Sequence, residues 1–207
     1  VVEQNMLIDK YGVDAIRYFL LREVPFGLDG DFSHSALVNR INSDLANDIG
    51  NLVSRSTAML GKYFGGELPT PGAADETDQK LIDLFAATVE AVDTHMENLA
   101  FNKALISIWE LISAGNKYID ETAPWALAKD ETQRERLATV IYNLHEAIRI
   151  VALLVAPFMP DTGAKILGIL GCDSSDLSLE GQEDWGGLQA GTQIEKATPL
   201  FPRIETE

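Results

Sequence analysis

The sequence predicts an all-α protein, an antiparallel helix bundle preceded by a small helical connective segment. Three observations support this prediction. Apolar residues recur at spacings of three, four and seven over most of the 207 residues, which is typical of helices with one buried face. Clusters of glycine and proline divide this pattern into segments of helix length. The sequence shows neither the alternation of a strand nor an internal repeat, and long helices with short connections pack as bundles.

The first two predicted helices are short. Apolar residues share one face between residues 5 and 22, and Gly12 interrupts them. We therefore expect a short helix, a turn, and a second helix over about residues 13–22. The stretch EVPFGLDGDFS that follows has the glycine and proline content of a loop. Ser33 or Ser35 then offers an N-cap for the next helix.

Four longer helices and a final short one are expected after this loop. Their expected bounds, in chain order, are Leu37 to Gly65, about Thr77 to Asn98, Phe101 to about Thr122, Leu137 to Val155, and Pro160 to Gly171. Glycine at the end and proline at the first position are the usual signals for such bounds. The rest of the chain, from Cys172, is rich in glycine and acidic residues. We expect it to be mostly irregular, with PLFPRIE forming an extended strap.

The charge and the cysteine content limit the classes of function. A formal net charge of −16 argues against broad electrostatic binding of nucleic acid, because phosphate binding depends on Lys and Arg. Any such binding must rest on local geometry. The single Cys172 excludes an internal disulfide and fits the reducing cytoplasm. The longest apolar run, residues 150–159, is shorter than the about 20 residues that span a bilayer, so no membrane partner is expected.

No catalytic or metal site is predicted in this chain. His34, His95 and His145 are far apart in sequence, Cys172 lies near no histidine, and no C-x-x-C pair is present. We interpret the three histidines as structural. The acidic clusters DETD (75–78) and QEDW (182–185) are expected to be solvated faces.

A polar stripe on the long helix is more informative. Asn47, Asn51 and Arg55 are four residues apart and therefore lie on one face of that helix. Amide and guanidinium groups read base edges by hydrogen bonding. The alternative is a solvent-facing stripe in which Arg55 pairs with a local carboxylate, and the spacing does not decide between the two interpretations.

The stretch YIDETAPWALAKDE places a tryptophan at a helix end. The residue before a proline is disfavoured in the helical region, so Ala123 should end a helix and Pro124 should fix a rigid corner. An indole held at such a corner can stack on an unpaired base. The alternative is that Trp125 folds back and fills the end of the bundle. The sequence pattern leaves both open.

Several of these stretches resemble those of one family. VVEQNMLIDKYGVDAIRYFLL resembles the segment after the KMSKS-type loop of class I aminoacyl-tRNA synthetases. REVPFGLDGDFS, which follows, resembles the methionyl-tRNA synthetases in particular. NLVSR (51–55) and ETAPWALAK (121–129) resemble the anticodon-reading motifs of that family, and PLFPRIE (199–205) resembles the strap of its bacterial members. The resemblance extends over essentially the whole chain, in order.

The resemblance implies both a fold and a function. The fold is the helical-bundle anticodon-binding domain of class I synthetases. A longer enzyme of this family ligates methionine to its tRNA with ATP and Mg²⁺, in the cytoplasm. In the family, an Asn and an Arg one turn apart and a Trp after a Pro contact the CAU anticodon. Carried over, these are Asn51, Arg55 and Trp125, with Pro124 fixing the corner. Further RNA contacts are expected from Asn47, Arg40 and Lys62.

The resemblance also suggests three regions. We expect residues 1–32 to be a connective, stem-contact-like segment that follows a catalytic domain, residues 33–171 to be the anticodon-binding bundle, and residues 172–207 to be the tail. This chain has no HIGH-type motif, KMSKS loop or zinc-bearing insertion. We therefore expect the chain by itself to bind no cofactor and to be catalytically inactive. Its partners would be the tRNA anticodon loop and the catalytic domain of the same protein.

The resemblance also implies an exposed apolar face on residues 1–32, to which Phe19, Leu20 and Phe26 should contribute.

Two rival interpretations remain. One is the anticodon-binding part of another class I synthetase, such as the cysteinyl enzyme, against which Asn51, Arg55 and Trp125 argue. The other is a purely structural helical interaction module, which predicts a buried Trp125.

Overall fold

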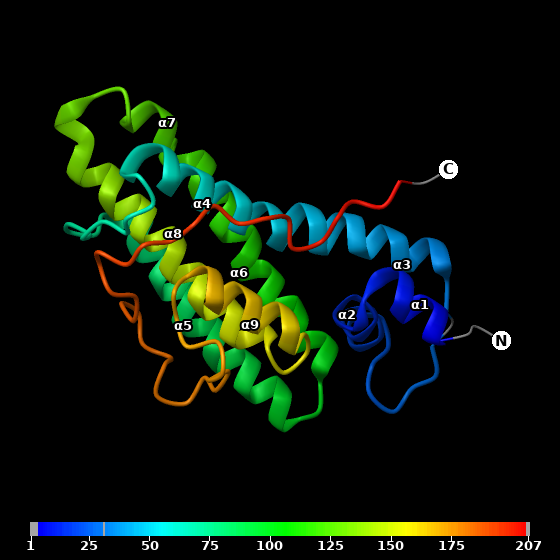
Figure 1. Ribbon diagram of the computed structural model, residues 1–207. Coiled ribbons are helices and arrows are strands. Elements are labelled where there is room, and N and C mark those ends of the chain that lie inside the picture. The colour runs from blue at the N-terminus through cyan, green and yellow to red at the C-terminus, as the bar shows by residue number, and fades with distance from the viewer. Residues whose placement is uncertain (1–3, 31, 206–207) are drawn as a thin grey trace.

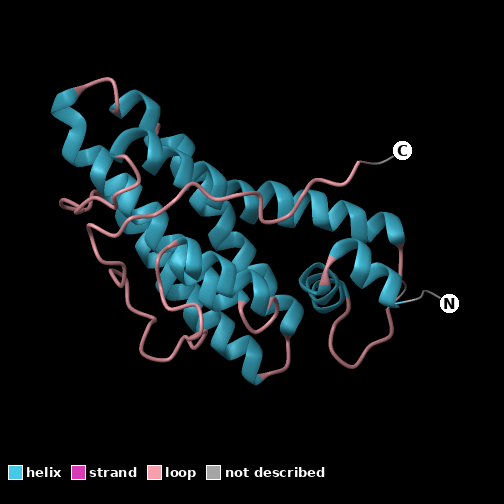
Figure 2. Cartoon of the chain, viewed as in Figure 1, coloured by secondary structure: helices cyan, strands magenta, loops and turns pink. Residues whose placement is uncertain are grey.

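The computed structural model of the protein describes residues 4–30 and 32–205, and it confirms the predicted helical bundle (Figures 1 and 2). Within these residues the only β-type pairing is one isolated bridge between Glu67 and Gln193. The helical elements are α1 (Gln4–Tyr11), α2 (Val13–Glu23), α3 (His34–Arg40), η1 (Ile41–Ile49), α4 (Gly50–Phe64), α5 (Glu76–Glu97), α6 (Phe101–Thr122), α7 (Pro124–Leu127), η2 (Glu131–Gln133), α8 (Arg134–Val155) and α9 (Pro160–Ile169).

Helix α8 lies at the centre of the bundle. Every residue from Leu137 to Val155 is buried, and α4, α5, α6 and α9 pack against this helix. By length and composition, residues 131–155 would suffice to cross a membrane, but their most apolar stretch is completely buried among the other helices. The apolar character of α8 is therefore explained by its position in the core.

The long predicted helix is continuous from α3 to α4, but its middle part, η1, is a π-helix. Ser33 caps the start, since its Oγ accepts a hydrogen bond from the amide of Ala36. The end is Gly65, in the left-handed conformation with φ of 63°. The sequence pattern did not predict η1, because an apolar face at helical spacing does not distinguish i→i+5 from i→i+4 hydrogen bonds.

Side chains of α6 bind the backbone of this π-helix. The indole Nε1 of Trp109 donates to the carbonyl oxygen of Asp44 at 3.2 Å. Two turns further along α6, Asn116 Nδ2 donates to the carbonyl oxygen of Asp48 at 3.1 Å. These contacts fix η1 against α6 at two points one helical turn apart.

The first two helices pack firmly on the bundle. The hydroxyl of Tyr18 donates to the buried carboxylate of Asp44 at 2.7 Å. The carboxylate of Asp14 accepts the backbone amide of Thr162 at 2.6 Å and so caps α9. The prediction that Phe19 is exposed was wrong, because its side chain is 3% exposed and joins the common core. Leu20 and Phe26 are exposed, as expected.

The acidic DETD cluster is only partly a solvated face. Asp75 is the N-cap of α5, and Asp75 and Asp78 form a reciprocal capping box. Glu76 is exposed, but Asp78 is completely buried. The expectation was wrong for Asp78, since the third residue of a capping box points back toward the helix start, here into the core.

A buried ion pair in α8 anchors the tail, which contains no helix or strand between residues 172 and 205. Glu146 and Arg149 are 2.6 Å apart and almost fully buried. Both bind backbone groups of the tail. The amides of Gly186, Gly187 and Leu188 donate to Glu146, and Arg149 donates to the carbonyl oxygens of Gln182 and Asp184.

The last part of the tail runs as a strap along the long helix, in the opposite direction (Figure 1). The amide of Ala197 donates to Thr57 Oγ1 at 3.0 Å. Further along, the side chain of Asn42 both accepts from and donates to the backbone of Ile204. The predicted extended strap is therefore held at two points, one on α4 and one on η1.

Replacing Glu146 by Ala should reduce the free energy of unfolding by about 3–5 kcal/mol, because it leaves the buried Arg149 without a counter-charge. Urea denaturation followed by circular dichroism measures this. The exposed Glu195 provides a control, since Glu195→Ala should change stability by less than about 0.5 kcal/mol. Similar losses in the two variants would show that the ion pair does not anchor the tail.

The stability of the fold should fall in mild acid because of His145. This imidazole is completely buried, and burial lowers its pKa from 6.5 to about 4, against a smaller opposite effect of the hydrogen bond to the carbonyl oxygen of Ile141. Between these pH values the unfolded chain binds the proton and the folded chain does not. Folding stability is therefore complete above about pH 6.5 and falls by up to about 1.4 kcal/mol per pH unit toward pH 4.

The variant His145→Gln isolates this effect, because its side chain is neutral throughout the range. We expect its free energy of unfolding to change less between pH 6.5 and pH 4 than that of the parent chain. Denaturant titrations at several pH values give the two slopes. Equal slopes would rule out His145 as the origin of the acid sensitivity.

Candidate nucleic-acid interface

The candidate interface begins with the close packing of α4 on α6. A Cβ atom at Gly115 would lie 3.2 Å from both methyl groups of Leu52, tighter than most contacts of this kind. The absence of a side chain at Gly115 therefore permits the two helices to approach. This approach brings the polar face of α4 next to the last turns of α6.

Arg55 contacts α6 directly. Its Nη2 donates to Oδ1 of Asp120 at 2.7 Å, and the two side chains are 31% and 64% exposed. Such an exposed ion pair contributes little to stability, but it orients the guanidinium. Arginine carries five N–H donors, and this contact occupies one of them. Arg55 is thus held at the end of α6 with donors available to a ligand.

The corner lies where the proline predicts it. Helix α6 ends at Thr122, and Ala123 adopts the left-handed conformation, with φ of 44° and ψ of 63°. Pro124 is buried and is the first residue of α7. Trp125 follows with 44% of its surface exposed. The buried proline anchors the corner, and the indole beside it remains accessible to solvent.

The structure brings Arg55 to the end of the helix that leads into this corner. Asp120, its partner, precedes Trp125 by five residues. Asn51 is exposed one turn before Arg55 and lines a hollow of about 160 Å³ between α4 and the strap. The three predicted residues therefore lie on α4 and at the α6–α7 corner, two elements that touch at Arg55.

The secondary candidates lie elsewhere along the long helix. Arg40 forms ion pairs with Glu23 and Asp44, and it precedes Arg55 by 15 residues, or roughly 22 Å of helix. Asn47 is exposed on η1. Lys62 is exposed near the end of α4, with its Nζ 5.4 Å from the ring centroid of Tyr63. Arg40 is thus directed to α2 and not to the α6 corner.

The contact between Arg55 and Asp120 was not predicted from the sequence. A signal for it was present, because Asp120 and Glu121 lie in the last turn of a predicted helix that has no basic residue there. Carboxylates are unfavourable at this negative end of the helix dipole. Glu121 is paired with Lys117 of the same helix, and Asp120 is paired with Arg55 of α4.

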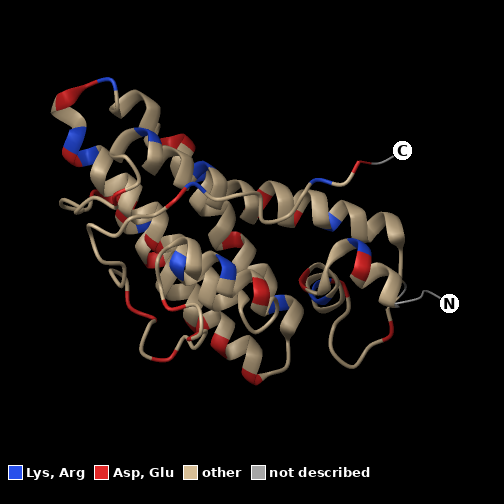
Figure 3. Cartoon of the chain, viewed as in Figure 1, with Lys and Arg blue, Asp and Glu red and all other residues tan. Residues whose placement is uncertain are grey.

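Much of the acidic excess lies on α5 and in the tail. Helix α5 contains six acidic residues and one basic residue, and residues 172–207 contain eight acidic and two basic residues. Figure 3 shows these acidic groups along α5 and the tail. Lys129 lies with Asp130 and Glu131 in the connection from the corner to α8. Arg134 is the first residue of α8, and its guanidinium is 4.0 Å from the ring centroid of Phe64, on α4.

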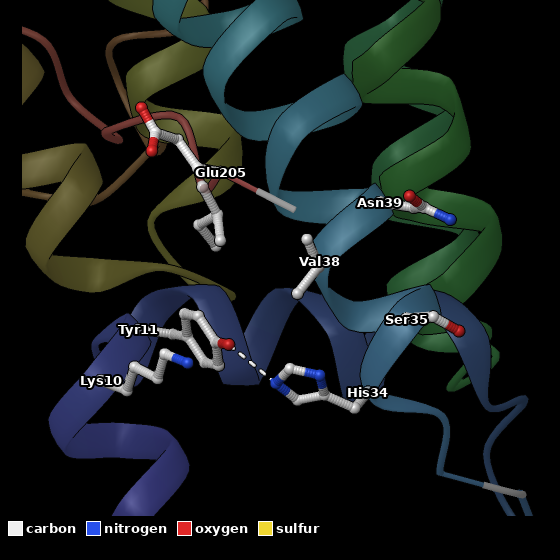
Figure 4. A pocket seen from close by; sticks show the side chains of 8 residues that line it. Lys10, Tyr11, His34, Ser35, Val38, Asn39 and Glu205 are labelled. Atoms are coloured by element: carbon white, nitrogen blue, oxygen red, sulfur yellow. Dashed lines mark hydrogen bonds between the residues drawn. The ribbon is translucent and has the colours of Figure 1, made fainter. Parts of the chain in front are cut away.

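A hollow at the other end of the molecule has a different character (Figure 4). It measures about 430 Å³ and lies between α1, α3 and the end of the strap. Tyr11 and His34 share a hydrogen bond of 2.7 Å there, with Lys10 and Glu205 on the lining. Within the described residues, no three His, Cys, Asp or Glu side chains gather as they would around a metal.

Comparison with known proteins identifies this arrangement. A family profile described as the anticodon binding domain of methionyl tRNA ligase matches residues 68–207. The chain belongs to this family. A second profile, for class I tRNA synthetases of the methionine type, matches residues 1–57. The helical bundle with the candidate interface is therefore an anticodon-binding domain of the methionyl-tRNA synthetase family.

Individual relatives agree with this assignment. The chain is 53% identical over 207 residues to a methionine–tRNA ligase of Caldanaerobacter subterraneus and 50% identical over 209 residues to that of Halalkalibacterium halodurans. It is matched over its full length and spans 32% of each of these relatives. It also superposes with a TM-score of 0.93, at 39% identity, on the ligand-free methionyl-tRNA synthetase of Mycobacterium tuberculosis, covering all of this chain and 42% of that one.

Proposed function

We propose that this chain reads the CAU anticodon of methionine tRNA with Asn51, Arg55 and Trp125, the last held in place by Pro124. The amide and the guanidinium would bind base edges, and the indole would stack on an unpaired base. Asn47 and Lys62 would add contacts to the RNA around these three. Arg40, which is already paired with two carboxylates, would contribute least to binding.

One observation supports this proposal above the others. Arg55, on α4, binds Asp120 in the last turn of α6, and the same helix leads directly into the corner with its exposed Trp125. Trp125 remains 44% exposed at a corner that the buried Pro124 fixes. A purely structural module needs neither an exposed indole at the end of α6 nor an arginine with unused donors on the same helix end, whereas an RNA-binding surface uses both.

The activity of the longer protein is part of the same proposal. We infer that it is a cytoplasmic methionine–tRNA ligase, which activates methionine with ATP and Mg²⁺ and transfers it to the tRNA. The methionine–tRNA ligases that this chain resembles support the inference. So does the structure of the Mycobacterium tuberculosis methionyl-tRNA synthetase in complex with methionyl-adenylate. That structure is 40% identical in sequence, with a TM-score of 0.91 over 98% of this chain and 40% of that one. The half-buried free thiol of Cys172 is compatible with a reducing compartment.

The net charge of −16 is compatible with this function if recognition depends on bases more than on phosphates. A stacked base contributes about 1–3 kcal/mol, as does a bidentate base contact. A weak overall positive field would also reduce binding to other RNAs. The acidic residues concentrated on α5 and the tail leave the basic groups on α4 and next to α8 to interact with phosphates locally.

Replacing Arg55 by Ala should weaken binding of a CAU anticodon stem-loop by about tenfold, in line with the loss of about 1–3 kcal/mol for a base contact. Binding of a stem-loop with a changed anticodon should hardly alter, and the dependence of log Kd on salt should stay the same. Fluorescence anisotropy with both RNAs at several salt concentrations measures these quantities.

Lys62 provides the matched control, as a second basic residue on the same helix. If it contacts phosphate, Lys62→Ala should weaken both RNAs alike and reduce the salt slope. An Arg55→Ala chain that behaves in this way would show that Arg55 binds the RNA backbone and reads no base.

Replacing Trp125 by Ala should weaken CAU stem-loop binding by about 5- to 100-fold, the effect of one lost stack of about 1–3 kcal/mol. Trp125→Phe should lie between the parent and the alanine variant, because a smaller ring still stacks. The melting temperature should change little, since Trp125 is 44% exposed and the loss should be far below the about 3–5 kcal/mol of a buried aromatic.

Trp109 provides the contrast, because it is 7% exposed and hydrogen-bonded to the π-helix. Trp109→Ala should lower the melting temperature strongly. If Trp125→Ala destabilises the chain as much as Trp109→Ala and binding falls only in proportion, Trp125 serves the fold and has no role in recognition.

A further inference from the structure

One buried carboxylate joins the two sides of the Trp125 corner. Asp78, in the first turn of α5, is completely buried. Its Oδ1 accepts the hydroxyl of Tyr118 at 2.5 Å, and its Oδ2 accepts Nη1 of Arg136 at 2.6 Å. Tyr118 lies before the corner on α6, and Arg136 lies after it on α8. Asp78 therefore holds the two ends of the segment 118–136, which contains the corner, at a fixed separation.

The contacts around this carboxylate are nearly complete. The amide of Asp75 donates to Asp78 Oδ2 at 2.9 Å. Arg136 also pairs with the carboxylate of Asp75 at 2.9 Å. From α8, Asn143 Nδ2 donates to the hydroxyl of Tyr118 at 3.3 Å. Three helices thus meet at one charged group, and each contributes a side chain to it.

The charge of Asp78 is retained in this buried place. Burial by itself raises the pKa of its carboxyl group, but the hydrogen bonds from Arg136, Tyr118 and the amide of Asp75 together lower it below its usual range. Hydrogen bonds to a buried ionised group are among the stronger and more directional ones in proteins. The position of Tyr118 relative to Arg136 is therefore closely defined.

The residues of the candidate interface follow Tyr118 closely along the chain, so the position of Tyr118 affects them. Asp120, which orients Arg55, comes two residues after Tyr118. The left-handed Ala123 and the buried Pro124 come within the next six residues. A displacement of the last turn of α6 would therefore move the partner of Arg55 and the indole of Trp125 together.

We infer that Asp78, with Tyr118 and Arg136, is a positioning residue for anticodon recognition, which sets the last turn of α6 and the Trp125 corner without touching the RNA. This inference rests on the proposed function for its effect on binding. The arrangement of the corner itself can be tested without RNA. Its merely structural alternative is that Asp78 stabilises the bundle as any buried ion pair does.

The chain offers a matched control for that alternative. Glu146 is also a completely buried carboxylate and is also paired with an arginine, but it lies on α8 and holds the tail. Asp78→Asn and Glu146→Gln therefore remove the same kind of charge from two different places. Tyr118→Phe is a milder variant that removes only one hydroxyl from the Asp78 contacts.

Trp125 reports on the corner and Trp185 on the tail, and Trp109 serves as a reference in the core. Trp125 lies at the corner, Trp185 lies in the tail with its ring centroid 5.3 Å from that of Phe85, and Trp109 lies in the core. The chain is labelled with 5-fluorotryptophan, and the ¹⁹F resonances are assigned by replacing each tryptophan with Phe. We expect Asp78→Asn and Tyr118→Phe to shift or broaden the Trp125 resonance and to leave that of Trp185 unchanged. Glu146→Gln should do the reverse.

RNA binding then tests the functional consequence. Asp78→Asn should weaken binding of the CAU stem-loop by about tenfold and Tyr118→Phe by about threefold. These losses correspond to part of the binding free energy that stacking and base contacts at the corner provide. Binding of a stem-loop with a changed anticodon should fall less, so that selectivity declines. Glu146→Gln should change neither affinity by more than about twofold, even at a similar loss of melting temperature.

An unchanged Trp125 resonance in Asp78→Asn and Tyr118→Phe would overturn the inference, as would an equal change in Glu146→Gln. A changed resonance with intact CAU selectivity would overturn the role in recognition, provided that Trp125→Ala does weaken binding. If Trp125→Ala itself leaves CAU binding unchanged, the proposed function fails. The fluorine spectra alone then decide whether Asp78 fixes the corner.

Discussion

The burial of α8 from Leu137 to Val155 is the constraint on which the rest of this structure depends. Polar side chains on a helix enclosed in this way cost free energy unless neighbouring elements provide partners for them. Arg136 binds Asp78 at the start of α5, and Asn143 binds Tyr118 near the end of α6. Arg149, which is paired with Glu146, binds the backbone of the tail. The polar groups of the central helix thereby determine where the surrounding elements attach.

The long helix formed by α3, η1 and α4 is the element at the surface to which both the strap and α6 attach. On one side the strap binds it at Asn42 and Thr57, and on another α6 binds it through Trp109, Asn116 and Asp120. The polar stripe of α4 lies between these two contacts. A ligand bound on this stripe, as we propose for the anticodon loop, would therefore contact α4, the strap and the end of α6 together.

Local chemistry made much of the fold predictable. The glycine at position 12, the Ser33 cap, the glycine end at Gly65 and the corner at Pro124 each follow from the residue itself. The remaining features depend on partners distant in sequence. Asp120 is 65 residues from Arg55, and Arg136 is 58 residues from Asp78. Carboxylates in the last turn of a helix indicate a nearby cation but do not identify Arg55, and the DETD stretch does not reveal that Asp78 is buried.

The π-helix has a consequence for the lengths that this segment tolerates. Because η1 has more residues per turn than an α-helix, it sets the rotation between Asn42, which holds the strap, and Arg55, which faces α6. Elsewhere, an inserted or deleted residue in a connection is absorbed locally. Within residues 41–49 it would instead turn one end of the helix against the other, so that either the strap or the α6 contact loses its register. The spacing between Asn42 and Arg55 is therefore a fixed quantity of this fold.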